Sequence, residues 1–151
     1  AGFAGALVVQ VGSAPTVAEG RVPWGPAAYL GDAVHWLPGP GAGPGAASSV
    51  LVGQGGGSVV AGVVRAGSGR AVVLAGRHLH RSATTRALVE ALAAQVPLAV
   101  VEMGWPGPWR PAGARAFVLT FGAGPANARA ALAALGVSGG SPDDRGQFSG
   151  S

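Results

Sequence analysis

Three short apolar runs, each followed by a helical pattern, most constrain how this chain can fold. They lie at residues 71–75, 98–102 and 116–121. Apolar strands that alternate with helices build a parallel sheet with helices on both faces. The sequence therefore predicts an α/β fold, a three-layer α/β/α sandwich with a mainly parallel sheet of about five or six strands.

Local patterns place the remaining elements of this sandwich. Two more strands are expected at residues 6–11 and 34–37, and helices are expected at 26–30, 58–66, 82–95 and 126–135. Ser58 is a candidate N-cap for the second helix, and Ser82 or Thr84 is one for the third. Gly136 is expected to end the last helix as its C′ residue.

Length and composition predict one folded domain with a terminal tail. The 151 residues suit a single domain, assigned to residues 1–137. The 28 glycines and 12 prolines gather between apolar segments, including a linker at 38–47. Residues 138–151 are expected to be a flexible tail, or residues added during cloning. Because the chain opens on a strand-like run without Met, we expect it to begin inside a longer protein.

The charge pattern argues against several classes of partner. The ten basic residues are all Arg, and the formal net charge is +4. Nucleic-acid binding needs basic residues that cluster with aromatic ones. The cluster at Arg77, Arg81 and Arg86 lacks that pattern, so no nucleic-acid partner is predicted. No run approaches the ~18 apolar residues of a membrane span, so none is predicted. Localisation stays open between cytoplasmic and secreted.

No motif in the sequence predicts a cofactor or a metal ion. The absence of Cys excludes disulfides and thiolate chemistry. Three His without a carboxylate cluster do not predict a metal site. The Gly-rich turn at 122–125 lacks the third glycine of a dinucleotide loop, because that position is Asn127. No cofactor is therefore expected.

Two polar loops indicate where a site would lie. Ligands of parallel sheets bind beyond the carboxyl ends of the strands, and residues 76–82 and 103–109 both follow strands. The first loop carries Arg77, His80 and Arg81 at a helix start, a position that favours anions. Ligand contact and structural hydrogen bonding are both compatible with these side chains, and the structural role is favoured.

Glu102 and two tryptophans complete the candidate residues. A buried carboxyl at the end of a strand suits a general acid, but it suits an ion pair with Arg77 or Arg81 equally well. The ion pair is favoured, because glycosidases need a second carboxylate that is not evident nearby. Trp105 and Trp109 flank a Pro-rich turn, where they would stack on a sugar or cover a domain interface.

Several of these segments resemble a known family. Residues 77–81, 101–106 and 120–127, together with 18–25, are similar to the C-terminal α/β domain of glycoside hydrolase family 3. The closest type is the actinobacterial β-N-acetylhexosaminidase branch. The resemblance covers about residues 7–135, and its most specific part is the run Glu102-Met-Gly-Trp-Pro106.

The resemblance implies a role within a larger enzyme. Members pair this domain with an N-terminal (β/α)8 barrel that carries the catalytic residues. A barrel of about 250 residues does not fit in this chain, so no catalytic residue is assigned. The chain would be a non-catalytic domain of a β-N-acetylglucosaminidase that shapes the barrel's active site, with an N-acetylglucosamine-containing sugar nearby. The alternative is a free-standing module that binds a sugar or an anion.

Overall fold

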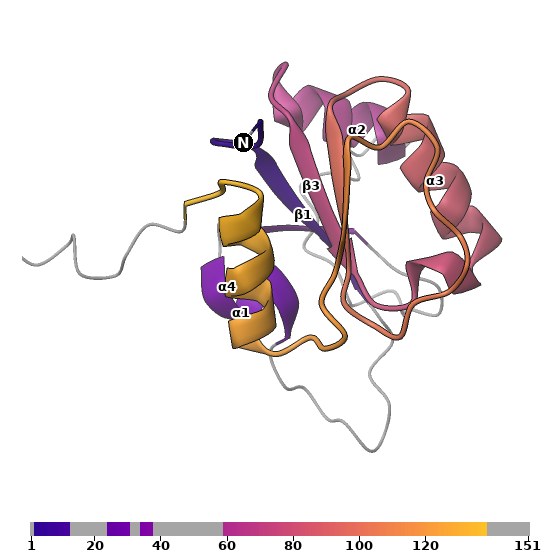
Figure 1. Cartoon of the computed structure of the whole chain (residues 1–151). Helices are drawn as coiled ribbons and strands as arrows, with labels where there is room; N and C mark the ends of the chain where they lie inside the picture. Colours follow the sequence, from indigo (N-terminus) through magenta and orange to yellow (C-terminus); the bar gives the residue numbers. More distant parts are fainter. Residues whose placement is uncertain (1, 13–23, 31–33, 38–58, 139–151) are drawn as a thin grey trace, which may run out of the picture.

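A five-stranded parallel sheet forms the centre of the molecule (Figure 1). The computed structural model describes residues 2–12, 24–30, 34–37 and 59–138. In this part of the chain the strands are β1 (Leu7–Val11), β2 (Val34–Leu37), β3 (Val72–Gly76), β4 (Leu98–Glu102) and β5 (Ala116–Leu119). Their order across the sheet is β2-β1-β3-β4-β5, and all four neighbouring pairs are parallel. The predicted fold class is therefore confirmed.

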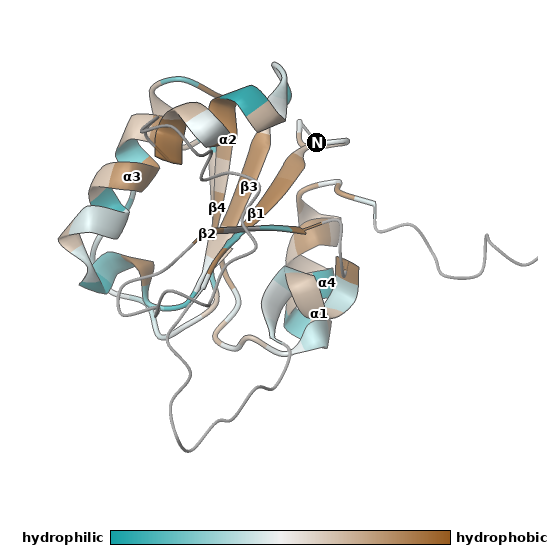
Figure 2. Ribbon diagram, turned by 180° about the vertical axis from the view of Figure 1, so that it is seen from behind, coloured by the Kyte–Doolittle hydropathy of each residue, from teal (hydrophilic) through white to brown (hydrophobic). Residues whose placement is uncertain are grey.

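Helices cover both faces of this sheet (Figure 1). Helices α1 (Gly25–Leu30) and α4 (Pro125–Ala134) pack together on one face. Helices α2 (Val59–Gly67) and α3 (Ala83–Ala93) pack together on the other, and α3 follows a 3-10 turn, η2 (Leu79–Arg81). Figure 2 shows the hydrophobic strands, coloured brown, between helices of mixed hydropathy.

Strand alternation divides the core into two layers. Val8, Val73 and Val101 face α1 and α4, whereas Val9 and Leu74 face α2 and α3. Side chains of successive strand residues point to opposite faces, so a strand buried on both faces is apolar at nearly every position. This explains why β1, β3 and β4 are nearly continuous apolar runs with every residue buried; the polar exceptions are Gln10 in β1 and Glu102 at the end of β4.

A buried amide joins the first strand to the first helix. Gln10 is fully buried, and its side chain donates to the carbonyl of Trp24 at 3.0 Å. Its Oε1 accepts a hydrogen bond from the N–H of Ala27 at 2.9 Å. The amide thereby satisfies an N–H in the first turn of α1, which has no partner within the helix. Both polar ends of the amide are paired, as burial requires.

The predicted boundaries of the helices and strands agree with the structure to within two residues. Ser82 caps α3, and Gly136 has the expected positive φ of 75°. The third helix was predicted to reach residue 95, but α3 ends at Ala93. The strand predicted at 116–121 ends at Leu119, because the backbone turns left-handed at Phe121. The predicted linker at 38–47, the cap at Ser58 and the tail from 139 lie outside the described residues.

Candidate functional site

The carboxyl ends of β3, β4 and β5 bring three loops to one rim of the sheet. We call the loops at 77–82, 103–109 and 120–124 the carboxyl-end rim. The ends of β3 and β4 are directly adjacent, because Gly76 and Glu102 are partners in the sheet register. The two polar loops predicted from the sequence therefore meet, as parallel strands require.

Glu102 is the structural centre of this rim. Its side chain is buried, and its Oε1 accepts hydrogen bonds from the N–H groups of His78 at 2.6 Å and Gly104 at 2.8 Å. Its Oε2 accepts one from the N–H of Leu79 at 2.8 Å. Hydrogen bonds to a charged acceptor are stronger than neutral ones. One carboxylate thus fixes the backbone of two loops.

This arrangement corrects the favoured interpretation of Glu102. An ion pair with Arg77 or Arg81 was expected, but backbone N–H groups are the hydrogen-bond donors on this carboxylate in the described part of the chain. The His80 imidazole lies beside the carboxylate, with its Nδ1 3.5 Å from Oε2. Every residue but Pro carries a backbone N–H group, so residue types do not show which loop N–H groups reach Glu102.

The loop after β3 is folded tightly to reach Glu102. His78 adopts a left-handed conformation with φ of 56°, which turns the N–H groups of His78 and Leu79 toward the carboxylate. Leu79 is buried and packs back against Gly76, where an added Cβ would lie 2.4 Å from its Cδ2. Among the residues that the structure describes, the Nδ1 atoms of His78 and His80 are buried and have no hydrogen-bond partner.

Gly104 lets the second loop approach the first. A Cβ atom at this position would lie 2.7 Å from His78 Nδ1 and 2.8 Å from the His78 nitrogen. Backbone atoms cannot retreat from such an overlap without moving the loop. The close approach of the two loops therefore requires glycine at position 104, next to the buried Met103.

Arg77 and Arg81, the two arginines predicted at the rim, have different environments. The Arg77 guanidinium carbon lies 5.8 Å from the ring centre of Trp24, within the range of a cation–π contact. Arg81 is exposed at the end of η2. Arg86, one turn into α3, donates to the carbonyl of His80 and so supports the same loop.

The structure separates the two predicted tryptophans. Trp105 is 73% exposed, the largest exposure of any large hydrophobic side chain that the structure describes. Trp109 instead packs on the α3 side of the core, and its Nε1 donates to Glu90 at 3.2 Å. The two tryptophans that flank the turn therefore have different surroundings, one exposed and one packed on the core.

Phe121 takes the place beside Trp105. Their ring centres are 6.3 Å apart in an edge-to-face arrangement, and Phe121 is 62% exposed. Phe121 has φ of 53°, which is unusual for a bulky side chain and costs conformational energy. Sequence reasoning missed this residue by assigning it to the last strand. The one local signal was its position between a strand and Gly122.

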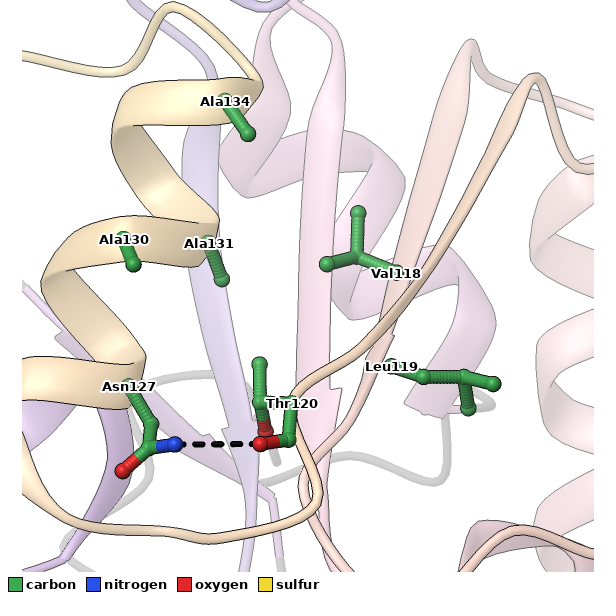
Figure 3. A pocket seen from close by; sticks show the side chains of 7 residues that line it. All are labelled: Val118, Leu119, Thr120, Asn127, Ala130, Ala131 and Ala134. Atoms are coloured by element: carbon green, nitrogen blue, oxygen red, sulfur yellow. Dashed lines mark hydrogen bonds between the residues drawn. The ribbon is translucent and has the colours of Figure 1, made fainter.

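Hydrogen bonds hold the loop that follows β5. The Asn127 side chain donates to the carbonyl of Thr120 at 3.0 Å, as Figure 3 shows. The Thr120 hydroxyl donates to the carbonyl of Gly122 at 2.6 Å. The exposed Trp105–Phe121 pair is therefore carried by two loops whose backbones are tied, one through Glu102 and one through Asn127.

The described residues contain no cluster suited to a metal. Groups of three or more His, Cys, Asp or Glu side chains at ligating distance are absent from this part of the chain. Within the same residues, no helix has the length and apolar character needed to cross a bilayer.

Comparisons with known proteins do not add a family. No family model, curated protein or solved structure matches this chain. The resemblance to the C-terminal domain of glycoside hydrolase family 3 stays a prediction from the motifs.

Proposed function

We propose that this chain is a non-catalytic α/β domain of a β-N-acetylglucosaminidase similar to glycoside hydrolase family 3. In this proposal its carboxyl-end rim packs against a (β/α)8 barrel and helps to shape the barrel's active site. The observation that carries the proposal is the Trp105–Phe121 pair, two large aromatic side chains exposed side by side on tied loops. Exposed aromatic surface of this kind is typical of interaction sites.

The strain at Phe121 supports a contact role for the pair. A bulky residue in the left-handed region costs roughly 1–3 kcal/mol, and such strain gathers at functional positions. Packing of the Phe121 ring within the chain offsets little of this cost, because the residue is 62% exposed. A partner that covers Trp105 and Phe121 would give the ring its burial.

The chemistry of Glu102 supports the non-catalytic half of the proposal. Its two oxygens accept three backbone hydrogen bonds, and the residue is only 2% exposed. A general acid must present its proton to a substrate. The other described carboxylate, Glu90, lies on α3 and bonds to Trp109. Hydrolysis by paired carboxylates requires two such groups facing one substrate.

Three tests bear on the proposal. The purified chain should release no fluorophore from 4-methylumbelliferyl N-acetylglucosaminide above a buffer control, whereas real turnover would refute the non-catalytic role. The reading frame upstream of Ala1 should encode a (β/α)8 barrel. In the full-length protein, Trp105→Ser with Phe121→Ser should weaken activity or barrel stability. Arg65→Ser, on the remote helix α2, is the control and should leave both unchanged.

The free-standing binding module is the second candidate, and the exposure of Trp105 is what favours it. A sugar ring stacks on an open aromatic face. Isothermal titration with N-acetylglucosamine, muropeptides and phosphate separates the two candidates. Saturable heat that is lost in both Trp105→Ala and Arg81→Ala would favour the module. A flat titration together with an upstream barrel would favour the domain of a larger enzyme.

A further inference from the structure

Within the part of the chain that the structure describes, the sheet has an open edge along β5. Among the described strands, β5 stands at the end of the order and pairs with β4 alone. The N–H of Thr120 donates to the carbonyl of Glu102, so by the alternation of the ladder the peptide groups of Phe117 and Leu119 point away from β4. These outward groups can pair with the backbone of another strand.

A groove runs beside this edge, between β5 and α4. Val118 and Thr120 line it from the strand side, and Ala130, Ala131 and Ala134 line it from the helix (Figure 3). Its volume is about 270 Å³. A water molecule occupies roughly 30 Å³ in the liquid, so the groove has room for apolar side chains. We call the outward edge of β5 together with this space the edge groove.

The composition of the edge groove favours an apolar strand. Residues 116–120 carry no charge, although exposed edges are commonly protected by Lys, Pro or inward charges. All side chains of β5 are half-buried rather than covered. The alanine side chains of α4 are small and leave space between this helix and β5. An added strand can therefore pack alternate side chains against the helix.

The charge around the edge groove indicates the ends of that strand. Arg115 is exposed immediately before β5. Arg110 lies on the other face of the sheet, where its guanidinium carbon is 4.7 Å from the ring centre of Phe117 and its Nη1 donates to the carbonyls of Gly107 and Trp109. The whole chain has ten arginines and six acidic residues, a formal net charge of +4. A binding partner with carboxylates beside its apolar residues would meet these cations favourably.

We propose that the edge groove binds an extended segment of another protein as a sixth strand. The segment would carry small apolar side chains at alternate positions and acidic residues at its end near Arg115. Backbone hydrogen bonds to Phe117 and Leu119 would supply affinity, and the groove against α4 would select the side chains. This site is separate from the aromatic pair, and it does not depend on the proposed function.

A second copy of this chain fits the edge groove less well. In an antiparallel pair of two β5 strands centred on Val118, Arg115 of each copy would face position 121 of the other copy, which is Phe121. A second copy therefore offers no carboxylate to Arg115, so an acidic segment from a different protein is the better occupant.

Nuclear magnetic resonance with model peptides tests the proposal. The probes are the capped peptide EEVTVTVEE, a basic version KKVTVTVKK, and an acidic version whose Val nitrogens are methylated. The acidic peptide should saturate the chain, with shifts and slowed hydrogen exchange at the amides of Phe117 and Leu119. The basic and methylated peptides should bind at least about tenfold more weakly, a difference well resolved by titration.

Two matched variants on α4 place the binding site. Ala130 and Ala133 are both exposed, but only Ala130 lines the groove. Ala130→Gln should weaken the acidic peptide about tenfold, and Ala133→Gln should change its affinity by less than about twofold. Equal affinities of the two variants, no saturation up to about 1 mM peptide, or shifts confined to Trp105 and Phe121 would each overturn the proposal.

Discussion

The Glu102 carboxylate lies 2.6 Å from the backbone nitrogen of His78, and this contact joins the ends of two neighbouring strands. The carboxylate is buried, and each of its oxygens has backbone donors. A charge in the interior is stable only when its hydrogen bonds are complete. The rim of the sheet therefore depends on one acidic side chain more than on its several arginines.

Glu102→Gln should lower the free energy of unfolding by about 2–4 kcal/mol. The amide keeps one acceptor oxygen but turns an NH₂ group toward N–H donors, so a buried donor loses its partner. Urea denaturation measures the change. Glu90→Gln is the control, because its contact with Trp109 is exposed, and it should cost under about 0.5 kcal/mol. Equal stability of the two variants would contradict the anchoring role of Glu102.

Gly104→Ala should destabilise the chain by more than about 2 kcal/mol. The new methyl group would lie 2.7 Å from His78 Nδ1 and 2.8 Å from the His78 nitrogen, so the two loops must separate. Gly67→Ala is the matched control. Its Cβ would meet Val72 Cγ2 at an ordinary 3.8 Å, and Ala favours a helix, so stability should stay or rise by about 0.5 kcal/mol. Thermal unfolding that ranks the variants the other way would show that the loops are not in close contact.

Phe121→Asn should raise the free energy of unfolding by about 0.5–1 kcal/mol. Asn tolerates the left-handed conformation that Phe121 holds at φ of 53°, and little packing is lost from an exposed ring. Trp105→Asn removes the same ring contact without relieving any backbone strain, so it should not stabilise. Paired urea titrations compare them. A clear loss of stability in Phe121→Asn would mean that the ring is retained for folding and not for contact.

Ser82→Ala should cost about 1 kcal/mol, since its hydroxyl accepts the N–H of Thr85 at 3.2 Å and so caps α3. Thr84, the other cap candidate in the sequence, lies inside the helix and is exposed. Thr84→Ala should therefore be neutral or slightly stabilising. Circular dichroism during thermal unfolding distinguishes them. The reverse order would place the start of α3 two residues later.

The candidate site was predictable in its place but not in its contacts. The alternation of apolar strands and helices placed Arg77, His80 and Glu102 at one rim, and His80 and Glu102 do lie together there. The donors that reach Glu102 are backbone groups, which every residue carries, so residue types do not single them out. The partner of Trp105 is Phe121, from a loop 16 positions along the chain, and Trp109 turns to the core instead.

The sequence by itself determined the elements whose signals are local: continuous apolar runs for strands buried on both faces, Ser82 at a helix start and Gly136 at a helix end. Such signals act within a few residues, so they survive without knowledge of the rest of the chain. Only the tertiary structure decided the strand order, the backbone ligands of Glu102 and the exposed pair of Trp105 and Phe121. These depend on which distant segments share an edge of the sheet, and that choice is made by packing in three dimensions.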